Sequence, residues 1–260
     1  MPAPNDPTTG RPLVIAVDGP SGSGKSSVSR EVARRLGLEY LDTGAMYRAA
    51  CWAVLDAGID PADPAAADAV AEQVRRLDLQ LGTDPSGPSV RVAGREISAE
   101  IRETRISTAV SAVATNLDVR AELQRRQREL IEAARTGPRS GCVAEGRDIT
   151  TVVAPDADVR ILLTASEEAR LARRSRELHG SASADAVAAT RDQIVRRDAD
   201  DSTVSDFQVA ADGVLHLDSS ALDFEQTVNA VLSAVSQTAN GSVADLDDSS
   251  ERAGAGSVPR

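Results

Sequence analysis

A glycine-rich stretch near the start of the chain has the residue types and the spacing that bind phosphate. It matches the pattern G-x-x-x-x-G-K-[ST]. The backbone N–H groups of such a loop point at phosphate oxygens, and the first turn of the following helix adds positive potential. We expect the Lys25 ammonium to reach the β- and γ-phosphates of ATP and the Ser26 hydroxyl to bind Mg²⁺. The expected ATP-binding residues are Gly19, Pro20, Ser21, Gly22, Ser23, Gly24, Lys25 and Ser26.

Lys25 also stands out by composition. It is the only lysine in the chain, and the remainder of the 29 Lys+Arg residues are arginines. Elsewhere the sequence uses arginine wherever a surface cation suffices. Position 25 therefore fits a site that needs a compact, mobile ammonium rather than a planar guanidinium.

Two polar residues follow the apolar run at 38–41, which predicts a short strand. Thr43 comes at the end of this run, and Arg48 lies about one turn inside the helix expected behind it. Ligands of open α/β sheets bind at the carboxyl edge of the parallel strands. We therefore expect a hydroxyl and a cation beside each other at this edge. Taken alone, Arg48 is equally typical of a solvated helix residue.

Further chemistry-bearing residues follow the apolar run at 141–144. Glu145 ends this predicted strand, and Arg147 and Asp148 lie in the loop behind it. Nucleotide-binding folds use a carboxylate in this position to order water around Mg²⁺, and this is the role we expect of Glu145. Arg147 and Asp148 are placed where side chains meet a ligand, but the same dipeptide also suits a structural ion pair.

A cluster of arginines lies on the helix predicted after the run at 159–163. Its members are Arg170, Arg173, Arg174 and Arg176. We interpret this helix as one arm of a phosphate-facing lid. A break at 179–183 and a second helical arm at 184–200 complete a pair of helices, which has the form of a lid that closes to exclude water.

Short apolar runs alternate with helical patterns along most of the chain, which predicts an α/β fold with a parallel sheet. Between 79 and 97 the pattern changes from helical to alternating, which predicts a small antiparallel meander inserted into that fold. The five predicted strands of the main sheet are 13–17, 38–41, 141–144, 159–163 and 214–217.

The composition predicts one domain with disordered ends. Residues 1–12 hold four prolines and no periodicity, and residues 237–260 are rich in Ser, Gly and Asp. We expect a disordered leader and a disordered acidic tail. The domain between them spans 13–236, with an insert at about 60–115, in which a helix begins at Ser98. The lid occupies about 170–202.

Composition also limits the partners. The net charge of −11 and the aromatic content of 2% argue against DNA or RNA, which require a basic surface and rings for the bases to stack on. Cys51 and Cys142 lie in apolar runs and are expected as reduced core residues rather than a redox pair. We expect no signal peptide, and the sequence holds no apolar run long enough to cross a bilayer. We expect a cytoplasmic monomer without a nucleic-acid polymer or a membrane as partner.

The motifs include no candidate general base, and this bears on which chemical group accepts the transferred phosphate. Phosphoryl transfer needs positioning and positive charge more than covalent chemistry. Neither histidine, His179 nor His216, lies in a context typical of a general base. An acceptor that is itself a phosphate is already ionised at neutral pH and needs no base, so a phosphate acceptor is favoured over an alcohol.

In their order along the chain, these motifs resemble those of the bacterial cytidylate kinases over about residues 13–235. The resemblance implies a P-loop kinase fold with a five-stranded parallel sheet, an antiparallel insert that enlarges the nucleoside-monophosphate-binding region, and a short helical lid. It also implies Mg²⁺-dependent transfer of the ATP γ-phosphate to CMP or dCMP. It rests on the segments 18–26, 41–48, 100–102, 111, 119–120, 125–128, 145–148, 151–156, 197–198 and 201–202.

The resemblance also implies roles for single residues. Those that would recognise cytosine are Ser111, Arg120 and Asp148. Those that would hold the acceptor phosphate are Thr43, Arg48 and Arg147, and those that would hold the ribose are Arg197 and Asp201. Those that would act on the transferred group are Lys25, Arg147, Arg173 and Arg174. A carboxylate suits cytosine because it accepts a hydrogen bond from the exocyclic N4 amine.

The sequence departs from the family pattern at two positions. Thr43 stands where the family often has Ser, which keeps the hydroxyl. Val204 stands where the pattern Asp-Ser-x-Arg places an arginine. We therefore expect a working but weaker kinase.

Two alternative functions remain open at this stage. One is a P-loop kinase that acts on another nucleoside monophosphate or on an alcohol. The other is a P-loop regulator or a nucleic-acid-associated NTPase, against which the acidic composition argues.

Overall fold

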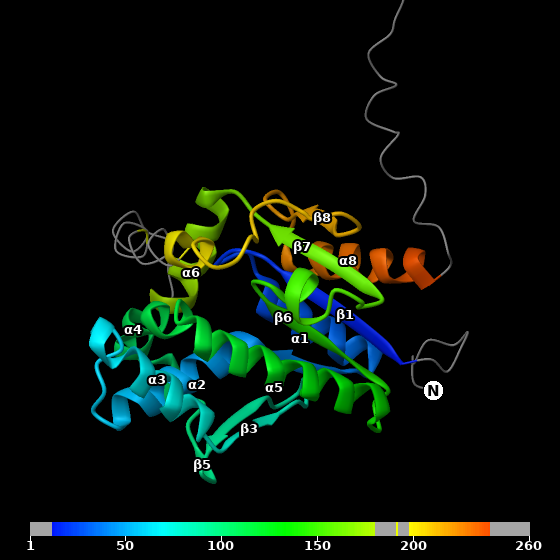
Figure 1. Ribbon diagram of the computed structural model, residues 1–260. Helices are drawn as coiled ribbons and strands as arrows, with labels where there is room; N and C mark the ends of the chain where they lie inside the picture. The colour runs from blue at the N-terminus through cyan, green and yellow to red at the C-terminus, as the bar shows by residue number, and fades with distance from the viewer. Residues whose placement is uncertain (1–11, 180–190, 192–197, 240–260) are drawn as a thin grey trace, which may run out of the picture.

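The computed structural model describes residues 12–179, 191 and 198–239, and Figure 1 shows their arrangement. At its centre lies a parallel sheet of five strands in the order β2-β6-β1-β7-β8. This confirms the predicted parallel sheet and all five of its strands, with boundaries that differ by a residue or two. The strands are β1 (Leu13–Asp18), β2 (Glu39–Asp42), β6 (Gly141–Gly146), β7 (Val159–Thr164) and β8 (Leu215–Asp218).

Helices cover both faces of this sheet, because its central strand is apolar on both sides. Val14 and Ala16 of β1 pack into one core with helices α2, α4 and α5, whereas Ile15 and Val17 pack into a second core with α1 and α8. This alternation follows the two-residue period of a strand. The α-helices whose bounds fall within the described residues are α1 (Lys25–Leu36), α2 (Thr43–Asp56), α3 (Ala67–Arg75), α4 (Thr104–Ala114), α5 (Leu117–Thr136), α6 (Glu167–His179) and α8 (Phe224–Ala239).

The insert carries a separate antiparallel sheet of three strands, as the alternating pattern predicts. A tight turn at Ala93 and Gly94, both with positive φ, joins the second strand to the third. Val90 and Val92 point into the core that contains α2 and α4, which attaches the small sheet to the rest of the domain. The strands are β3 (Leu79–Gly82), β4 (Ser89–Val92) and β5 (Arg95–Glu96).

Two helices differ from their predicted boundaries. The helix expected to begin at Ser98 is a short 3₁₀ turn, η2 (Glu100–Arg102), followed by α4 from Thr104. Glu103 between them has an extended backbone with ψ 151°, which interrupts the helical hydrogen bonds while Ile101 stays buried. At the other end of the chain, α8 continues to Ala239 and so includes the first three residues of the predicted tail, 237–239.

Several predicted segments lie largely outside the described residues. Of the leader at 1–12 only Pro12 is described, and of the tail only 237–239. The second lid arm, predicted at 184–200, is described only at Arg191 and at 198–200. Within the described parts of the chain, no helix combines the length and the apolar character that a membrane span requires.

Asp18, the last residue of β1, joins the sheet to the loop behind β6. It is 2% exposed, and its carboxylate accepts hydrogen bonds from Ile149 N at 2.9 Å, Thr150 N at 2.8 Å and Thr150 Oγ1 at 2.6 Å. Burial raises the pKa of this carboxyl, and the three hydrogen bonds oppose that rise. The contacts fix the start of the π-helical turn η3 (Ile149–Val153), which directly follows Arg147 and Asp148.

Replacing Asp18 by Ala is expected to lower the free energy of unfolding by about 2–4 kcal/mol, because buried N–H and O–H donors lose their acceptor. Chemical denaturation measures this change. The matched control is Asp156→Ala, which removes an exposed ion pair with Arg135 and should cost less than about 1 kcal/mol. Equal losses in the two variants would contradict a structural role for Asp18.

Candidate functional site

A large cavity lies at the carboxyl ends of strands β1, β2 and β6. Its volume is about 1260 Å³, which exceeds the ~300–1,000 Å³ of a pocket for one small ligand. Residues of the glycine loop, the start of α2, the end of β6 and helix α6 line it. The predicted sites after β2 and β6 therefore lie in one cavity, which the glycine loop and α6 also line.

The glycine loop occupies the position that its motif predicts, between β1 and α1. Gly19 has φ +154°, and a Cβ at this position would lie 2.1 Å from the carbonyl oxygen of Leu163 in β7, so only glycine fits there. Gly24 precedes α1 in a left-handed conformation and provides no side-chain cap. The first N–H groups of α1 thus lack a capping side chain, which leaves the positive end of this helix available to an anion.

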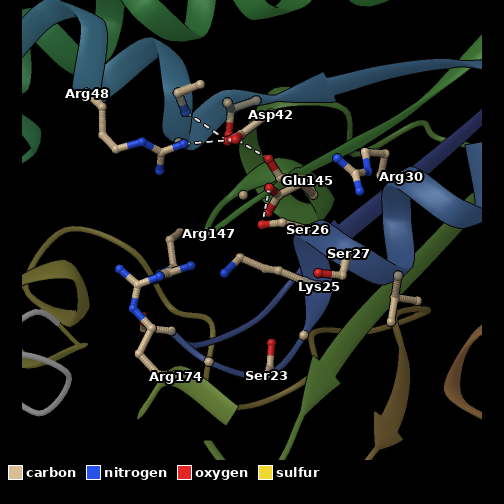
Figure 2. A pocket seen from close by; sticks show the side chains of 18 of the residues that line it. Ser23, Lys25, Ser26, Ser27, Arg30, Asp42, Arg48, Glu145, Arg147 and Arg174 are labelled. Atoms are coloured by element: carbon tan, nitrogen blue, oxygen red, sulfur yellow. Dashed lines mark hydrogen bonds and ion pairs between the residues drawn. The ribbon is translucent and has the colours of Figure 1, made fainter. Parts of the chain in front are cut away.

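Lys25 is the first residue of α1, and its ammonium extends into the cavity. Figure 2 shows the side chain pointing toward Arg147. Lys25 is 9% exposed, and its Nζ lies 3.3 Å from the carbonyl oxygen of Pro20, to which it donates. A backbone carbonyl of the glycine loop thus holds the ammonium of Lys25, which lines the cavity.

Ser26 and Glu145 form a pair at the predicted Mg²⁺ position. The Ser26 hydroxyl donates to Glu145 Oε1 at 2.7 Å, and the Tyr40 hydroxyl donates to the same oxygen at 3.2 Å. Glu145 is 2% exposed, and burial, together with the negative charge of Asp42, raises the pKa of its carboxyl. A cation near this carboxylate would offset both effects. A hydroxyl backed by a buried carboxylate fits Mg²⁺, which keeps several of its waters and takes few protein ligands.

Asp42 is a site residue that the sequence interpretation missed. Its carboxylate pairs with Arg48 at 2.8 Å and accepts a hydrogen bond from Ala45 N at 2.8 Å, which caps α2. Burial alone would raise the pKa of Asp42, but Arg48 and the cap outweigh it and lower the pKa. An Asp directly before a predicted helix is an N-cap signal, so the position was recognisable. Its pairing with Arg48 was not.

Thr43 and Arg48 both line the cavity. The Thr43 hydroxyl donates to the backbone carbonyl of Glu145 at 2.7 Å, and Thr43 is 3% exposed. Figure 2 shows the Arg48 side chain reaching from α2 to Asp42. Thr43 thereby connects the start of α2 with the end of β6, and Arg48 connects α2 with the end of β2.

Arg147 connects the end of β6 with the glycine loop. Its Nη1 donates to the carbonyl oxygen of Gly19 at 2.8 Å, and its Nε donates to Asp201 Oδ2 at 3.1 Å. Asp198 Oδ1 lies 3.9 Å from Nη2. The side chain is 14% exposed and lines the cavity. Arg147 and Asp201, which the resemblance links to the acceptor phosphate and the ribose, are thus direct partners.

Arg120 and Asp148 form a buried ion pair, with Arg120 Nη2 2.5 Å from Asp148 Oδ2. Gln124, one turn along α5, donates to the same oxygen at 2.7 Å. Arg120 also lies over the ring of Tyr47, 6.0 Å from its centroid. Two residues that are 28 positions apart therefore form one polar group on the cavity wall.

Ser111 and Arg197 are not brought into this group. Ser107, Val110 and Ala114 of α4 line the cavity, but Ser111 does not. It follows Val110 by one position, which turns it about 100° around the helix. Arg197 lies outside the described residues.

The arginines of α6 divide into two groups. Arg173 donates to the backbone carbonyls of Ser23 at 3.0 Å and Ser219 at 2.6 Å, and burial lowers its pKa. Arg170 likewise bonds a glycine-loop carbonyl and pairs with Asp198. These two fasten α6 to the loop. Arg174 instead reaches toward the cavity beside Arg147 in Figure 2.

A family model and three similar proteins indicate the same family for this chain. The family model for cytidylate kinase matches residues 15–237. A cytidylate kinase from Streptomyces avermitilis is 46% identical over 86% of this chain and 93% of its own length. Cytidylate kinases from Nocardia farcinica and Cutibacterium acnes are 47% and 48% identical, over 87% of this chain and 94% and 97% of their own lengths.

Proposed function

The chain belongs to the cytidylate kinase family, and from this premise we propose that it transfers the γ-phosphate of ATP to CMP or dCMP. The products are ADP and CDP or dCDP. One observation supports the proposal most: the glycine-loop ammonium lies in the same cavity as the Asp42–Arg48 pair, Arg147 and the buried Arg120–Asp148 pair. That cavity has room for two nucleotides.

On the donor side, the glycine loop binds the ATP phosphates through its backbone N–H groups and the positive end of α1. Lys25 neutralises charge on the β- and γ-phosphates. Ser26 would hold Mg²⁺, and Glu145 would hold the waters around it. A bound Mg²⁺ would supply positive charge that offsets the negative charge developing on the phosphates.

On the acceptor side, Arg48 and Arg147 bind the phosphate of CMP, and Thr43 at the start of α2 adds a hydroxyl. Arg48 is held at one position by Asp42, and Arg147 by Gly19 and Asp201. Guanidinium groups that are positioned before the substrate arrives need little reorganisation in the transition state. Asp201, with Arg197, contacts the ribose.

The cytosine ring is recognised by the Arg120–Asp148 pair, whereas Ser111, which the resemblance also links to cytosine, does not line the cavity. Asp148 accepts from the N4 amine of cytosine, while Arg120 donates to N3 and O2. Arg120 and Gln124 hold the Asp148 carboxylate in place. Uracil has a carbonyl where cytosine has the amine, so a carboxylate here discriminates against UMP.

Transfer then requires charge stabilisation between two aligned phosphates. The acceptor oxygen is already ionised, so no side chain has to remove a proton from it. Lys25, Arg147 and Arg174 supply positive charge at the transferred group, and Arg173 contributes by holding α6 against the loop. Closure of the lid at about 170–202 excludes water, which would otherwise compete as acceptor.

We further infer that the enzyme is a monomer that works in the cytoplasm.

A panel of acceptors tests this function. ADP release is measured by a coupled assay with CMP, dCMP, UMP, AMP, dTMP and shikimate as acceptors. CMP and dCMP are expected to give the highest kcat/KM. A higher value for AMP, dTMP or shikimate would favour another small-molecule kinase. ATP hydrolysis that is stimulated by polynucleotides, without transfer to CMP, would favour a nucleic-acid-associated NTPase.

Val204 provides a second test, because it stands where the family pattern has an arginine. A charged hydrogen bond contributes about 1.5–3 kcal/mol, so its absence corresponds to roughly ten- to a hundredfold in kcat/KM. The side chain is partly exposed and follows Asp201 by three positions. We expect Val204→Arg to raise kcat/KM for CMP about tenfold, with Val204→Leu unchanged as control. Equal activities in all three proteins would show that this charge is dispensable here.

A further inference from the structure

Phe207 lies against Arg147, in a segment that belongs to none of the binding motifs. The guanidinium carbon of Arg147 is 5.0 Å from the centroid of the Phe207 ring. Phe207 is 1% exposed, and it is one of only two phenylalanines in the 260 residues of the chain. Its buried neighbours are Leu162 of β7 and Val214. This buried ring therefore contacts apolar side chains and one cation.

The other contacts of Arg147 restrain the guanidinium on two different sides. Its Nε donates to Asp201 and its Nη1 to the carbonyl of Gly19. Within the described residues Nη2 makes no hydrogen bond, and it lies 3.9 Å from the carboxylate of Asp198. Nη2 thus has both of its N–H groups available to a ligand in the cavity.

We propose that Phe207 is a positioning residue that holds the plane of the Arg147 guanidinium, so that Nη2 faces the acceptor phosphate. The two hydrogen bonds fix the position of the group, but they leave it able to rotate about the line through their donor nitrogens, Nε and Nη1. An aromatic face attracts a cation within about 6 Å and restrains that rotation. The proposal rests on the proposed role of Arg147 in binding the acceptor phosphate.

A double-mutant cycle tests this coupling. Phe207→Leu keeps an apolar side chain but removes the ring, and we expect it to lower kcat/KM for CMP about five- to thirtyfold. Phe207→Tyr keeps the ring and should restore most of the activity. In an Arg147→Ala background, Phe207→Leu should change kcat/KM by less than about twofold, because the residue through which it acts is gone.

The matched control is Val214→Ala, which perturbs the same buried cluster without contact to Arg147. It should lower the midpoint of thermal unfolding but leave kcat/KM for CMP within about twofold of the original protein. An equal effect of Phe207→Leu in both backgrounds would overturn the proposal, since Phe207 would then act only as a core residue. No effect of Phe207→Leu in either background would overturn it as well.

A spectroscopic measurement separates this proposal from the proposed function. The Nε–Hε signal of Arg147, identified by its loss in Arg147→Lys, should carry a ring-current shift that disappears in Phe207→Leu and persists in Val214→Ala. If the protein phosphorylates no nucleoside monophosphate, the proposed function fails, while this signal still decides whether Phe207 positions Arg147. An Arg147 signal that is identical in Phe207→Leu would overturn the positioning role even in an active kinase.

Discussion

Lys25→Ala is expected to lower kcat for CMP phosphorylation by at least about a thousandfold. The ammonium is placed at the floor of the cavity by the fold of the glycine loop, with Nζ 3.3 Å from the carbonyl of Pro20. It would contact the phosphate oxygens on which charge develops in the transition state. Because no other lysine exists in the chain, no like side chain can take its place. Because Lys25 acts on the phosphates of ATP rather than on the acceptor, the loss should be the same for every acceptor.

Two further variants show whether the ammonium itself is required. Lys25→Arg keeps the charge but replaces a compact, rotatable donor by a planar fork, and it should remain at least about a hundredfold impaired. Arg34→Ala removes an exposed cation near the end of the same helix and should leave kcat unchanged. Thermal unfolding verifies that all three proteins are folded. A Lys25→Ala protein that retains a tenth or more of the original kcat would contradict the role of Lys25.

Asp148→Ala is expected to have the second-largest effect, a reduction of the CMP-to-UMP ratio of kcat/KM by about ten- to a hundredfold. The carboxylate is held by Arg120 at 2.5 Å and by Gln124 at 2.7 Å, so it presents a fixed acceptor to the base. Cytosine offers an amine to that acceptor and uracil a carbonyl. Removing the acceptor should lower activity with CMP far more than activity with UMP.

The ratio is the appropriate measurement because the variant breaks a buried ion pair. Loss of one partner from such a pair costs about 3–5 kcal/mol of stability, and any unfolded fraction lowers both activities equally. Asp148→Asn sharpens the test, since its amide can donate to the uracil carbonyl and should shift the ratio further toward UMP. An unchanged ratio in both variants would show that cytosine is selected by other residues, although the glycine loop would still bind ATP.

Much of the main sheet was predictable because strand periodicity is local. Val14 to Val17 alternate between the two cores simply because successive side chains of a strand point to opposite faces. The turn at Ala93 and Gly94, and with it the small antiparallel sheet, was likewise predictable from residue type. The interruption at Glu103 was not, because no proline or glycine marks it and the break depends on how Ile101 packs.

The predicted roles on α6 show where sequence reasoning is weaker. Four arginines on one helix look alike in the sequence, yet Arg173 donates to backbone carbonyls of Ser23 and Ser219, and Arg174 points into the cavity. Their different surroundings follow from the packing of α6 against the glycine loop. The partners of Arg173 are 150 and 46 positions away in the chain. No spacing rule within the helix contains that information.

The sequence by itself determined the phosphate-binding loop, because consecutive backbone N–H groups, glycines and one lysine perform that function within a single segment. It also determined the parallel sheet, whose strands are encoded in short apolar runs. Only the tertiary structure decided which charges meet: Asp42 with Arg48, Arg120 with Asp148, and Arg147 with both Asp201 and Phe207. The physical reason is that an ion pair or a ring contact depends on the distance between side chains. For residues far apart in the sequence, this distance is set by the strand order and by the packing of helices on the sheet.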